Sequence, residues 1–417
     1  MVAPTSTLQL VTPPAKPLAP ATAAGLRQVL NDLGTELRFN ARSSKVEVWQ
    51  GGDWQPLTER PAARLRERIA EHFDEDREQQ QARRPLRFTD SRWRQAVHAV
   101  VDEIDPFREA LEALPPWDGV PRLDHWLDTC FVLDPATPPA LRAWASRSVL
   151  LAAVWRACRP GTKHDLIVVL VGPQGVGKSS AFAWLFPPCE REFWFSDSLS
   201  LSSSERERVE ALQGRVIVEC AELAGATRVD LTRLKAFVSR TDDGGTRLAY
   251  RRDPEPRPRR AVIVGTTNDM SCLPNDSTGN RRFIPIAVTA GQVRHMRAWL
   301  DQHREQLWAE ALCLYRAGEP AYLPDDLVET QARVTERYRD ADDVVENRID
   351  RWLDRSDLPE FFKVEDVAVE IGLVDQPGRL SRTLARRIRA ALTLRGCVPA
   401  RTRLDGARHP IRCYRRP

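Results

Sequence analysis

Six consecutive apolar residues, Leu166 to Val171, are followed at once by a glycine-rich segment. The run predicts a parallel strand buried on both faces, because a half-exposed strand would alternate apolar with polar side chains. The next residues fit the spacing G-x-x-x-x-G-K-[ST] without a gap, which is typical of loops that bind nucleotide phosphates. The segment comprises Gly172, Pro173, Gln174, Gly175, Val176, Gly177, Lys178, Ser179 and the adjoining Ser180.

Each residue type in this segment has a physical reason to be there. The glycines permit backbone dihedrals closed to other residues, so that several N–H groups can turn toward phosphate oxygens. A helix beginning near Lys178 would direct the positive end of its dipole at the same phosphates. Lys178 would reach the β- and γ-phosphates, and the Ser179 hydroxyl would bind Mg²⁺. The segment therefore predicts a P-loop, with ATP and Mg²⁺ as cofactors.

A second apolar strand carries acidic residues at its end. Val216 to Val218 lead into Glu219, and Glu222 follows three residues later. In parallel sheets that bind nucleotides, the metal and the attacking water lie at the carboxyl edge of the strands. We expect Glu219 on the metal and Glu222 on the water, or the two roles exchanged. The plain alternative is a charged loop after a strand.

Two later segments offer further catalytic groups. The apolar run from Ala261 ends at Asn268, and an asparagine at a strand end beside phosphates can orient the hydrolytic water. After a Gly-Asn turn come Arg281 and Arg282, either of which could present a guanidinium to a γ-phosphate. Ion pairing within the subunit is an equally good interpretation of either arginine.

Composition narrows the class of protein. The formal net charge is +4 over 417 residues, so a surface that binds a polyanion has to be local. Eight cysteines are scattered without a C-x-x-C pair, which argues against a zinc site and fits reduced thiols. The sequence has no signal-peptide pattern and no apolar run of membrane-spanning length. We therefore expect a soluble cytoplasmic protein with no membrane partner.

The C-terminal region combines helices, a hairpin and many arginines. Two helical patterns precede a stretch from Val398 to Tyr414 that indicates two strands around Asp405-Gly406. Two helices and a hairpin predict a winged helix. Residues 378–417 contain twelve arginines and one acid, which favours a nucleic-acid surface over the alternative, a subunit contact. The candidate contact residues on the second helix are Arg382, Arg386, Arg387 and Arg389.

These patterns divide the chain into five parts. Residues 1–22 are rich in Pro, Ala and Thr and predict a disordered lead. A small α+β domain is expected over 23–104, a helical collar over 105–160, and an α/β ATPase core over 161–320. The remainder, 321–417, would form a helical linker and the winged helix.

Taken in order, six segments resemble one known family. They are GPQGVGKSS, VIVECAEL, LTRLKAFVSR, DDGGTRLAYRR, RRAVIVGTTND and NDSTGNRRFIPI. This order resembles the virulence-associated protein E family, which are phage- and plasmid-type P-loop ATPases similar to superfamily 3 helicases of the AAA+ group. The resemblance covers roughly residues 90–310.

The resemblance implies properties that spacing alone does not. It implies a ring, taken as a hexamer, with ATP bound between neighbours and an arginine finger supplied in trans by Arg281 or Arg282. It also implies a basic hairpin near the central pore that grips single-stranded DNA, a role that arginines on phosphates and a stacking tyrosine would suit. An ordinary solvated turn is the alternative for this hairpin. Its residues are Arg247, Tyr250, Arg251 and Arg252.

The function predicted from these features is that of an ATP-dependent DNA helicase or translocase in the replication system of a phage or other mobile element. We expect no primase module fused to the ATPase, so a separate primase is a candidate partner. One alternative is an ATP-gated, DNA-binding initiator or scaffold that does not unwind DNA. Another is a P-loop ATPase effector of phage defence.

Overall fold

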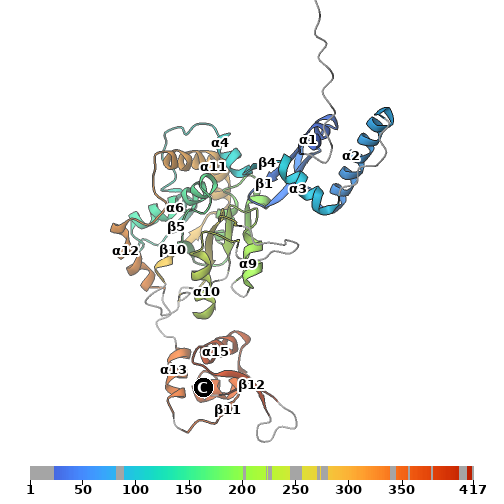
Figure 1. The fold of residues 1–417 in the computed structure, drawn as a ribbon. Coiled ribbons are helices and arrows are strands. Elements are labelled where there is room, and N and C mark those ends of the chain that lie inside the picture. The colour runs from blue at the N-terminus through green and yellow to red at the C-terminus, as the bar shows by residue number, and fades with distance from the viewer. Residues whose placement is uncertain are drawn as a thin grey trace, which may run out of the picture. The chain divides into compact units, whose positions relative to one another are not determined.

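The computed structural model describes residues 23–80, 89–200, 203–221, 223, 228–244, 256–269, 273, 280–338, 344–355, 357–376, 379–402 and 411–415. The chain divides into two compact units, residues 1–106 and 107–417 (Figure 1). The lead expected to be disordered, residues 1–22, lies outside the described residues.

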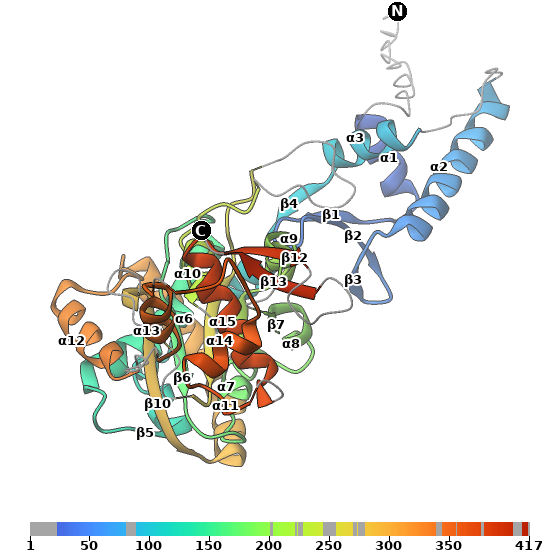
Figure 2. The ribbon, with the colours of Figure 1, turned by 90° about the horizontal axis from the view of Figure 1, so that it is seen from below.

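The first unit is a four-stranded sheet with helices packed on it. The strand order is β3-β2-β1-β4, and Figure 2 shows β1 and β2 side by side. The two-residue turn between β2 and β3 consists of Gly51 and Gly52, both with positive φ, as a tight hairpin turn requires. The elements are α1 (Ala23–Asp32), β1 (Leu37–Asn40), β2 (Lys45–Gln50), β3 (Asp53–Pro56), α2 (Glu59–Gln80), α3 (Asp90–Val100) and β4 (Asp102–Ile104).

The second unit is built on a six-stranded sheet in the order β5-β10-β6-β9-β8-β7. All neighbouring strands are parallel except the edge pair β5–β10. The α/β class with a parallel-strand sheet is thus confirmed. The strands are β5 (Phe131–Leu133), β6 (Ile167–Val171), β7 (Phe195–Leu199), β8 (Ile217–Cys220), β9 (Val262–Thr267) and β10 (Phe283–Gly291).

The strand β6 has β9 on one side and β10 on the other, and the connections that follow the neighbours β6 and β9 lead toward opposite edges of the sheet, to β7 and to β10. In open α/β sheets, ligands bind at such a switch point, beyond the carboxyl ends of the strands. All five residues of β6 are buried, as the apolar run predicts. The sheet topology therefore places the glycine-rich segment at the position where a ligand is expected.

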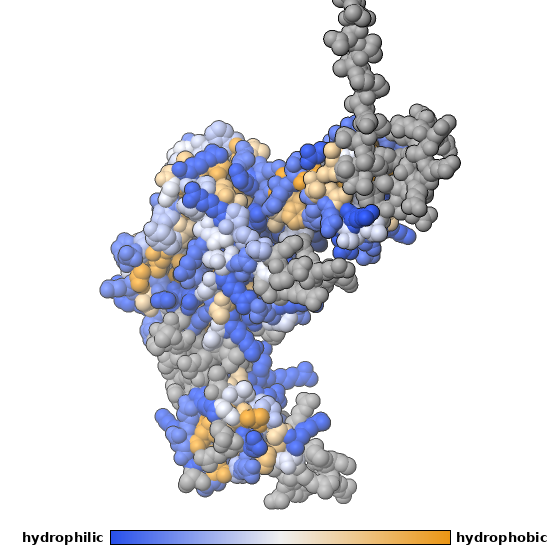
Figure 3. Space-filling model, viewed as in Figure 1, coloured by the Kyte–Doolittle hydropathy of each residue, from blue (hydrophilic) through white to orange (hydrophobic). Residues whose placement is uncertain are grey.

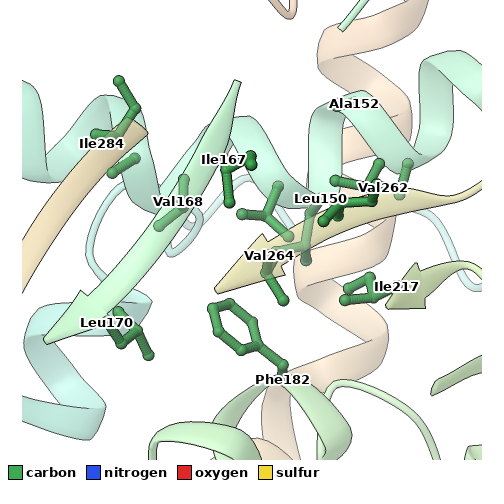
Figure 4. Close-up of a cluster of buried hydrophobic side chains, with 14 of the residues drawn as sticks. Leu150, Ala152, Ile167, Val168, Leu170, Phe182, Ile217, Val262, Val264 and Ile284 are labelled. Atoms are coloured by element: carbon green, nitrogen blue, oxygen red, sulfur yellow. The ribbon is translucent and has the colours of Figure 1, made fainter. Parts of the chain in front are cut away.

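Helices pack around this sheet and complete a single hydrophobic core. Figure 4 shows Phe182 of α7 pointing toward Val264 on β9, and Leu150 of α6 beside Val262. β5 comes from the stretch expected to be a helical collar, but it is an edge strand of the sheet. The helices are α4 (Pro106–Glu112), α5 (Trp126–Cys130), α6 (Pro139–Cys158), α7 (Lys178–Ala183), α8 (Arg191–Trp194), α9 (Glu205–Leu212), α10 (Arg228–Val238), η1 (Asn280–Arg282, a 3₁₀ helix), α11 (Val293–Arg316) and α12 (Asp325–Glu336).

The last part of the chain has a hydrophobic cluster of its own. Its three-stranded antiparallel sheet has the order β11-β13-β12, and α13 and α14 both pack against α15. Trp352 and Phe362 meet edge to face, with ring centroids 4.8 Å apart, inside this cluster. The elements are α13 (Val344–Leu353), β11 (Phe361–Phe362), α14 (Val364–Glu370), α15 (Arg382–Leu394), β12 (Val398–Thr402) and β13 (Ile411–Arg415).

The surface turned to the viewer in Figure 3 is largely hydrophilic, with small separate hydrophobic patches. None of the helices in the described ranges is long and apolar enough to cross a membrane.

A buried histidine lies just before β6. The Nδ1 atom of His164 is 3.1 Å from the carbonyl oxygen of Ala321, and the His164 carbonyl accepts a hydrogen bond from Arg156. Burial, together with the nearby Arg156 charge, lowers the pKa of His164 to about 3. The imidazole is therefore neutral in the folded chain and gains a proton readily only on unfolding.

This histidine predicts a loss of stability in acid. Because its pKa falls from about 6.5 unfolded to about 3 folded, its contribution to stability is lost as the pH falls through that window. We expect roughly 1.4 kcal/mol to be lost per pH unit from this group. Urea unfolding at pH 7, 5.5 and 4 should give a shallower pH dependence for His164→Asn than for the wild type. Equal slopes would show that His164 already takes up its proton in the folded state.

Candidate functional site

The segment between β6 and α7 leaves the sheet at its carboxyl edge. The Gly172 N–H donates to the Thr267 carbonyl at the end of β9, with an N–O distance of 3.1 Å. Gly177 has φ +91°, a left-handed conformation that favours glycine, and α7 begins at the next residue, Lys178. The strand, loop and helix expected from the sequence are thus all present.

The backbone of β10 holds this loop at both ends. A Cβ atom built on Gly172 would lie 2.1 Å from the Val288 carbonyl oxygen, and one on Gly291 would lie 2.2 Å from the Val176 carbonyl oxygen. No side chain fits at either contact. These two glycines are therefore needed for the loop to lie against β10.

Lys178 folds back over its own loop. Its Nζ atom donates to the carbonyl oxygens of Gly172 and Pro173, each at 2.7 Å. Burial lowers the pKa of Lys178, and the charge of Glu219 opposes that shift. Phosphate oxygens placed in the loop would compete with these two carbonyls for the ammonium group.

Glu219, at the end of β8, is the central acid of the site. It is fully buried, and its Oε1 accepts hydrogen bonds from Ser179 Oγ, at 2.7 Å, and from Thr266 Oγ1. Its Oε2 is also buried and has no hydrogen-bond partner among the described residues. Burial raises the pKa of Glu219, while the two hydroxyl donors act in the opposite direction.

An orphaned carboxylate oxygen beside a serine hydroxyl fits a magnesium site. Mg²⁺ prefers oxygen ligands, takes one or two carboxylates from the protein and completes its shell with water and substrate phosphates. Within the described part of the chain, no three His, Cys, Asp or Glu residues cluster as a metal cage would require. Ser179 and Glu219 would hold the ion, and Thr266 would orient the Glu219 carboxylate.

Two of the predicted catalytic residues follow strands of the sheet. Asn268 comes directly after β9, whose Val171↔Thr267 pairing places it beside the start of the loop, and its side chain is exposed. Glu222 lies outside the described residues, so its role and the choice of catalytic base remain predictions. The hairpin residues Arg247, Tyr250, Arg251 and Arg252 also lie outside them.

The two adjacent arginines have different surroundings. Arg282 donates from Nε to Ser239 Oγ at 2.9 Å, and its Nε lies 3.8 Å from Asp165 Oδ2. Arg281 is exposed, and within the described residues no hydrogen bond or ion pair involves its side chain. Arg282 is thus used inside the subunit, whereas Arg281 is available to a group outside it.

Two residues of this region were missed by the sequence analysis. Thr266 is the second donor to Glu219, and the Gly-Thr-Thr-Asn end of its strand was a usable signal. Lys235 is 5% exposed and donates from Nζ to Asn280 Oδ1 at 3.0 Å, which ties α10 to the turn that carries the two arginines. In the sequence, the available sign of this role was that Lys235 stands among apolar residues of α10.

The arginines expected to bind nucleic acid lie on α15. Arg382, Arg386 and Arg389 are exposed, and Arg387 is half-buried. Arg386 also lies 3.7 Å from the Asp230 carboxylate, and its side chain is 50% exposed.

Comparison with known proteins places the chain in a family. Residues 111–340, more than half of the chain, match the profile of the Virulence-associated protein E-like domain. This match confirms the resemblance found in the motifs. No curated protein matches the chain.

Several solved structures match the chain at low sequence identity and low TM-score. An apo structure of the C-terminal region of NrS-1 is 14% identical with a TM-score of 0.45, and the match covers 95% of this chain and 100% of that one. A second apo structure of the same region is 13% identical with a TM-score of 0.46, covering 95% and 99%. The X-ray structure of JCV helicase is 14% identical with a TM-score of 0.22, covering 59% and 74%.

Because one oxygen of Glu219 has no partner among the described residues, we expect Glu219→Gln to lose little or no stability in the absence of metal. In Glu219→Gln an amide replaces a buried carboxylate, so without divalent cation the variant should unfold at the same temperature as the wild type or a higher one. MgATP should raise the melting temperature of the wild type by several degrees and that of Glu219→Gln by much less. Thermal melts with and without MgATP measure both effects. A variant that is less stable without metal, yet equally stabilised by MgATP, would rule out the metal role.

Proposed function

Because this chain belongs to the Virulence-associated protein E-like family, we propose that it is an ATP-driven DNA helicase or translocase of a phage or mobile-element replication system. The observation that carries the proposal is the buried Glu219 carboxylate. One of its oxygens accepts from the Ser179 hydroxyl at the end of the glycine-rich loop, and the other has no partner among the described residues. A buried carboxylate with one oxygen left unpaired is costly, so its presence favours a bound cation.

The residues of the loop have distinct tasks in ATP hydrolysis. Backbone N–H groups of residues 174–179 would bind phosphate oxygens, and Lys178 would exchange its two loop carbonyls for the β- and γ-phosphates. Mg²⁺ bound at Ser179 and Glu219 would neutralise charge on those oxygens. Asn268 would orient the water, with Glu222 or Glu219 as its base.

The arginine turn supports hydrolysis between subunits. We assign the finger to Arg281, because it is exposed, and a positioning role to Arg282, because it is held by Ser239. Lys235 and Gln331 add to this support, since Gln331 donates to the Phe283 carbonyl at 2.8 Å directly after the turn. The site of one subunit would then be completed by Arg281 of its neighbour, as in a ring, with six subunits taken from the family resemblance.

The base of the basic segment supports a hairpin. The Asp243 N–H donates to the Arg257 carbonyl, and the Arg259 N–H donates to the Thr241 carbonyl, so the chain leaves and returns as an antiparallel pair. The Arg259 guanidinium is 1% exposed and donates to the Asp243 carboxylate. The antiparallel pair and the Arg259–Asp243 contact would together hold Arg247, Tyr250, Arg251 and Arg252 on one hairpin. We propose that this hairpin binds single-stranded DNA.

The C-terminal helices and the sheet β11-β13-β12 support a winged helix over residues 344–415. In this fold two helices pack against a third that stands beside a β-hairpin, which is the order of α13, α14, α15 and β12–β13 here.

If each ATP site takes residues from two neighbouring subunits, two variants that are inactive alone should restore ATP turnover when they are mixed. Lys178→Ala removes a subunit's own phosphate contact but keeps Arg281, and Arg281→Ala does the reverse. Each alone should lose about 100-fold or more of the wild-type ATP turnover. In an equal mixture about a quarter of the interfaces would carry both residues, so turnover should recover to that order. The assay is phosphate release, with particle mass recorded for each sample.

The matched control mixes Lys178→Ala with Glu219→Gln, whose defects lie in the same site. No interface in that mixture is complete on its ATP-binding side, so it should remain inactive. Equal turnover in the two mixtures, from particles of equal mass, would contradict the assignment of Arg281 to the neighbour's site.

A further inference from the structure

We propose that Asp197 is a second acid of the magnesium site, so that its carboxylate and that of Glu219 bind the ion from two adjacent strands. The inference rests on the proposed function, because it adds a residue to the nucleotide site described above. Asp197 is the third residue of β7, and Glu219 is the third residue of β8. The two strands are parallel neighbours in the sheet.

The pairing of β7 with β8 changes register at Asp197. It is regular at Ser196 and resumes at Leu199, three residues later, whereas the partners of these two residues on β8 are only two residues apart. Asp197 and Ser198 therefore stand together opposite the single residue Glu219. A bulge of this kind takes a residue out of regular pairing, and bulges are common beside active sites, where they redirect a side chain.

The two serines that flank Asp197 are bonded to each other. Their Oγ atoms lie 2.7 Å apart, and the Ser198 N–H donates to Ser196 Oγ at 3.2 Å. Because successive side chains of a strand point to opposite sides, the side chain of Asp197 lies on the side away from the serines. Asp197 is exposed, and no hydrogen bond or ion pair among the described residues involves its carboxylate. That carboxylate is therefore available to a ligand.

Glu219 has different neighbours on its two sides. Its Oε1 accepts from Thr266 on β9, the strand on one side of β8, and from Ser179 on α7. Asp197 comes from β7, the strand on the other side, which α7 also contacts. Burial raises the pKa of Glu219, and the negative charge of Asp197 adds to that rise. The two carboxylates are thus close enough to repel each other.

A divalent cation would remove this repulsion. Two neighbouring carboxylates are unfavourable while both are charged and nothing compensates them, and Glu219 Oε2 is buried without a partner among the described residues. Mg²⁺ binds one or two carboxylates of a protein and completes its shell with substrate phosphates and water. Glu219, Asp197 and the hydroxyl of Ser179 provide that set of oxygens at one edge of the sheet.

The test uses the full chain carrying Asp197→Asn, which keeps the shape of the side chain and removes its charge. The matched control is Glu192→Gln, which removes one exposed carboxylate from α8, directly before β7. The affinity for ATP that carries a fluorescent N-methylanthraniloyl group is measured in excess Mg²⁺ and in EDTA. The ratio of the two affinities is the gain that the ion gives to binding. Melting temperature without nucleotide and ATP turnover are recorded for each protein.

We expect Asp197→Asn to lose about tenfold of the gain with Mg²⁺, with no fall in its affinity in EDTA or in its melting temperature, and the control to match the wild type. An equal gain in Asp197→Asn and the wild type would overturn the proposal, and a fall in turnover alone would assign Asp197 to the attacking water. Equal losses of affinity in Mg²⁺ and EDTA, or a lower melting temperature, would also overturn it. No gain in the wild type would contradict the magnesium site as a whole, and with it the proposed function.

Discussion

The rest of the site depends on the buried carboxylate of Glu219. Its Oε1 joins three pieces of the chain, because it accepts from Ser179 after the loop and from Thr266 on β9 while it stands on β8. Its Oε2 is left without a partner among the described residues. A buried carboxylate in this state raises the free energy of the folded chain, so the fold retains it at a cost that a bound cation would offset. The position of the loop follows from the same region, since β10 approaches it so closely at Gly172 and Gly291 that a methyl group would not fit.

A second set of contacts runs from α10 to the arginine turn. Lys235 and Ser239 lie within one helical turn of each other and bond to Asn280 and Arg282, respectively. The Arg259 guanidinium, at the base of the segment proposed to form the basic hairpin, donates to the carbonyl of Phe237 at 2.6 Å, in the last turn of the same helix. The base of that segment and the arginine turn are therefore both attached to the end of α10. That arrangement gives a short physical connection between the segment proposed to bind single-stranded DNA and the residue proposed to act on ATP.

Much of this architecture could be predicted from local sequence. An unbroken apolar run predicted β6, a glycine-rich spacing predicted the loop, and apolar residues ending in acid or amide predicted β8 and β9. Pairings between distant segments could not be predicted in the same way. β5 is three residues long and becomes a strand only through contact with β10, more than 150 residues later. Arg281 and Arg282 looked equivalent in the sequence, because the partners of Arg282, Ser239 and Asp165, come from segments that only the fold brings near. Lys235 was overlooked for the same reason.

Steady-state ATP turnover distinguishes a motor from a protein that only binds ATP. It is measured for the wild type and for Lys178→Ala, each with and without single-stranded DNA, with particle mass recorded. A motor should show turnover by a particle of several subunits, a rise when single-stranded DNA is added, and loss of both in Lys178→Ala. If the wild type binds ATP and assembles but turns over negligibly with or without DNA, the protein is not a motor. The remaining interpretation would then be an ATP-gated, DNA-binding initiator.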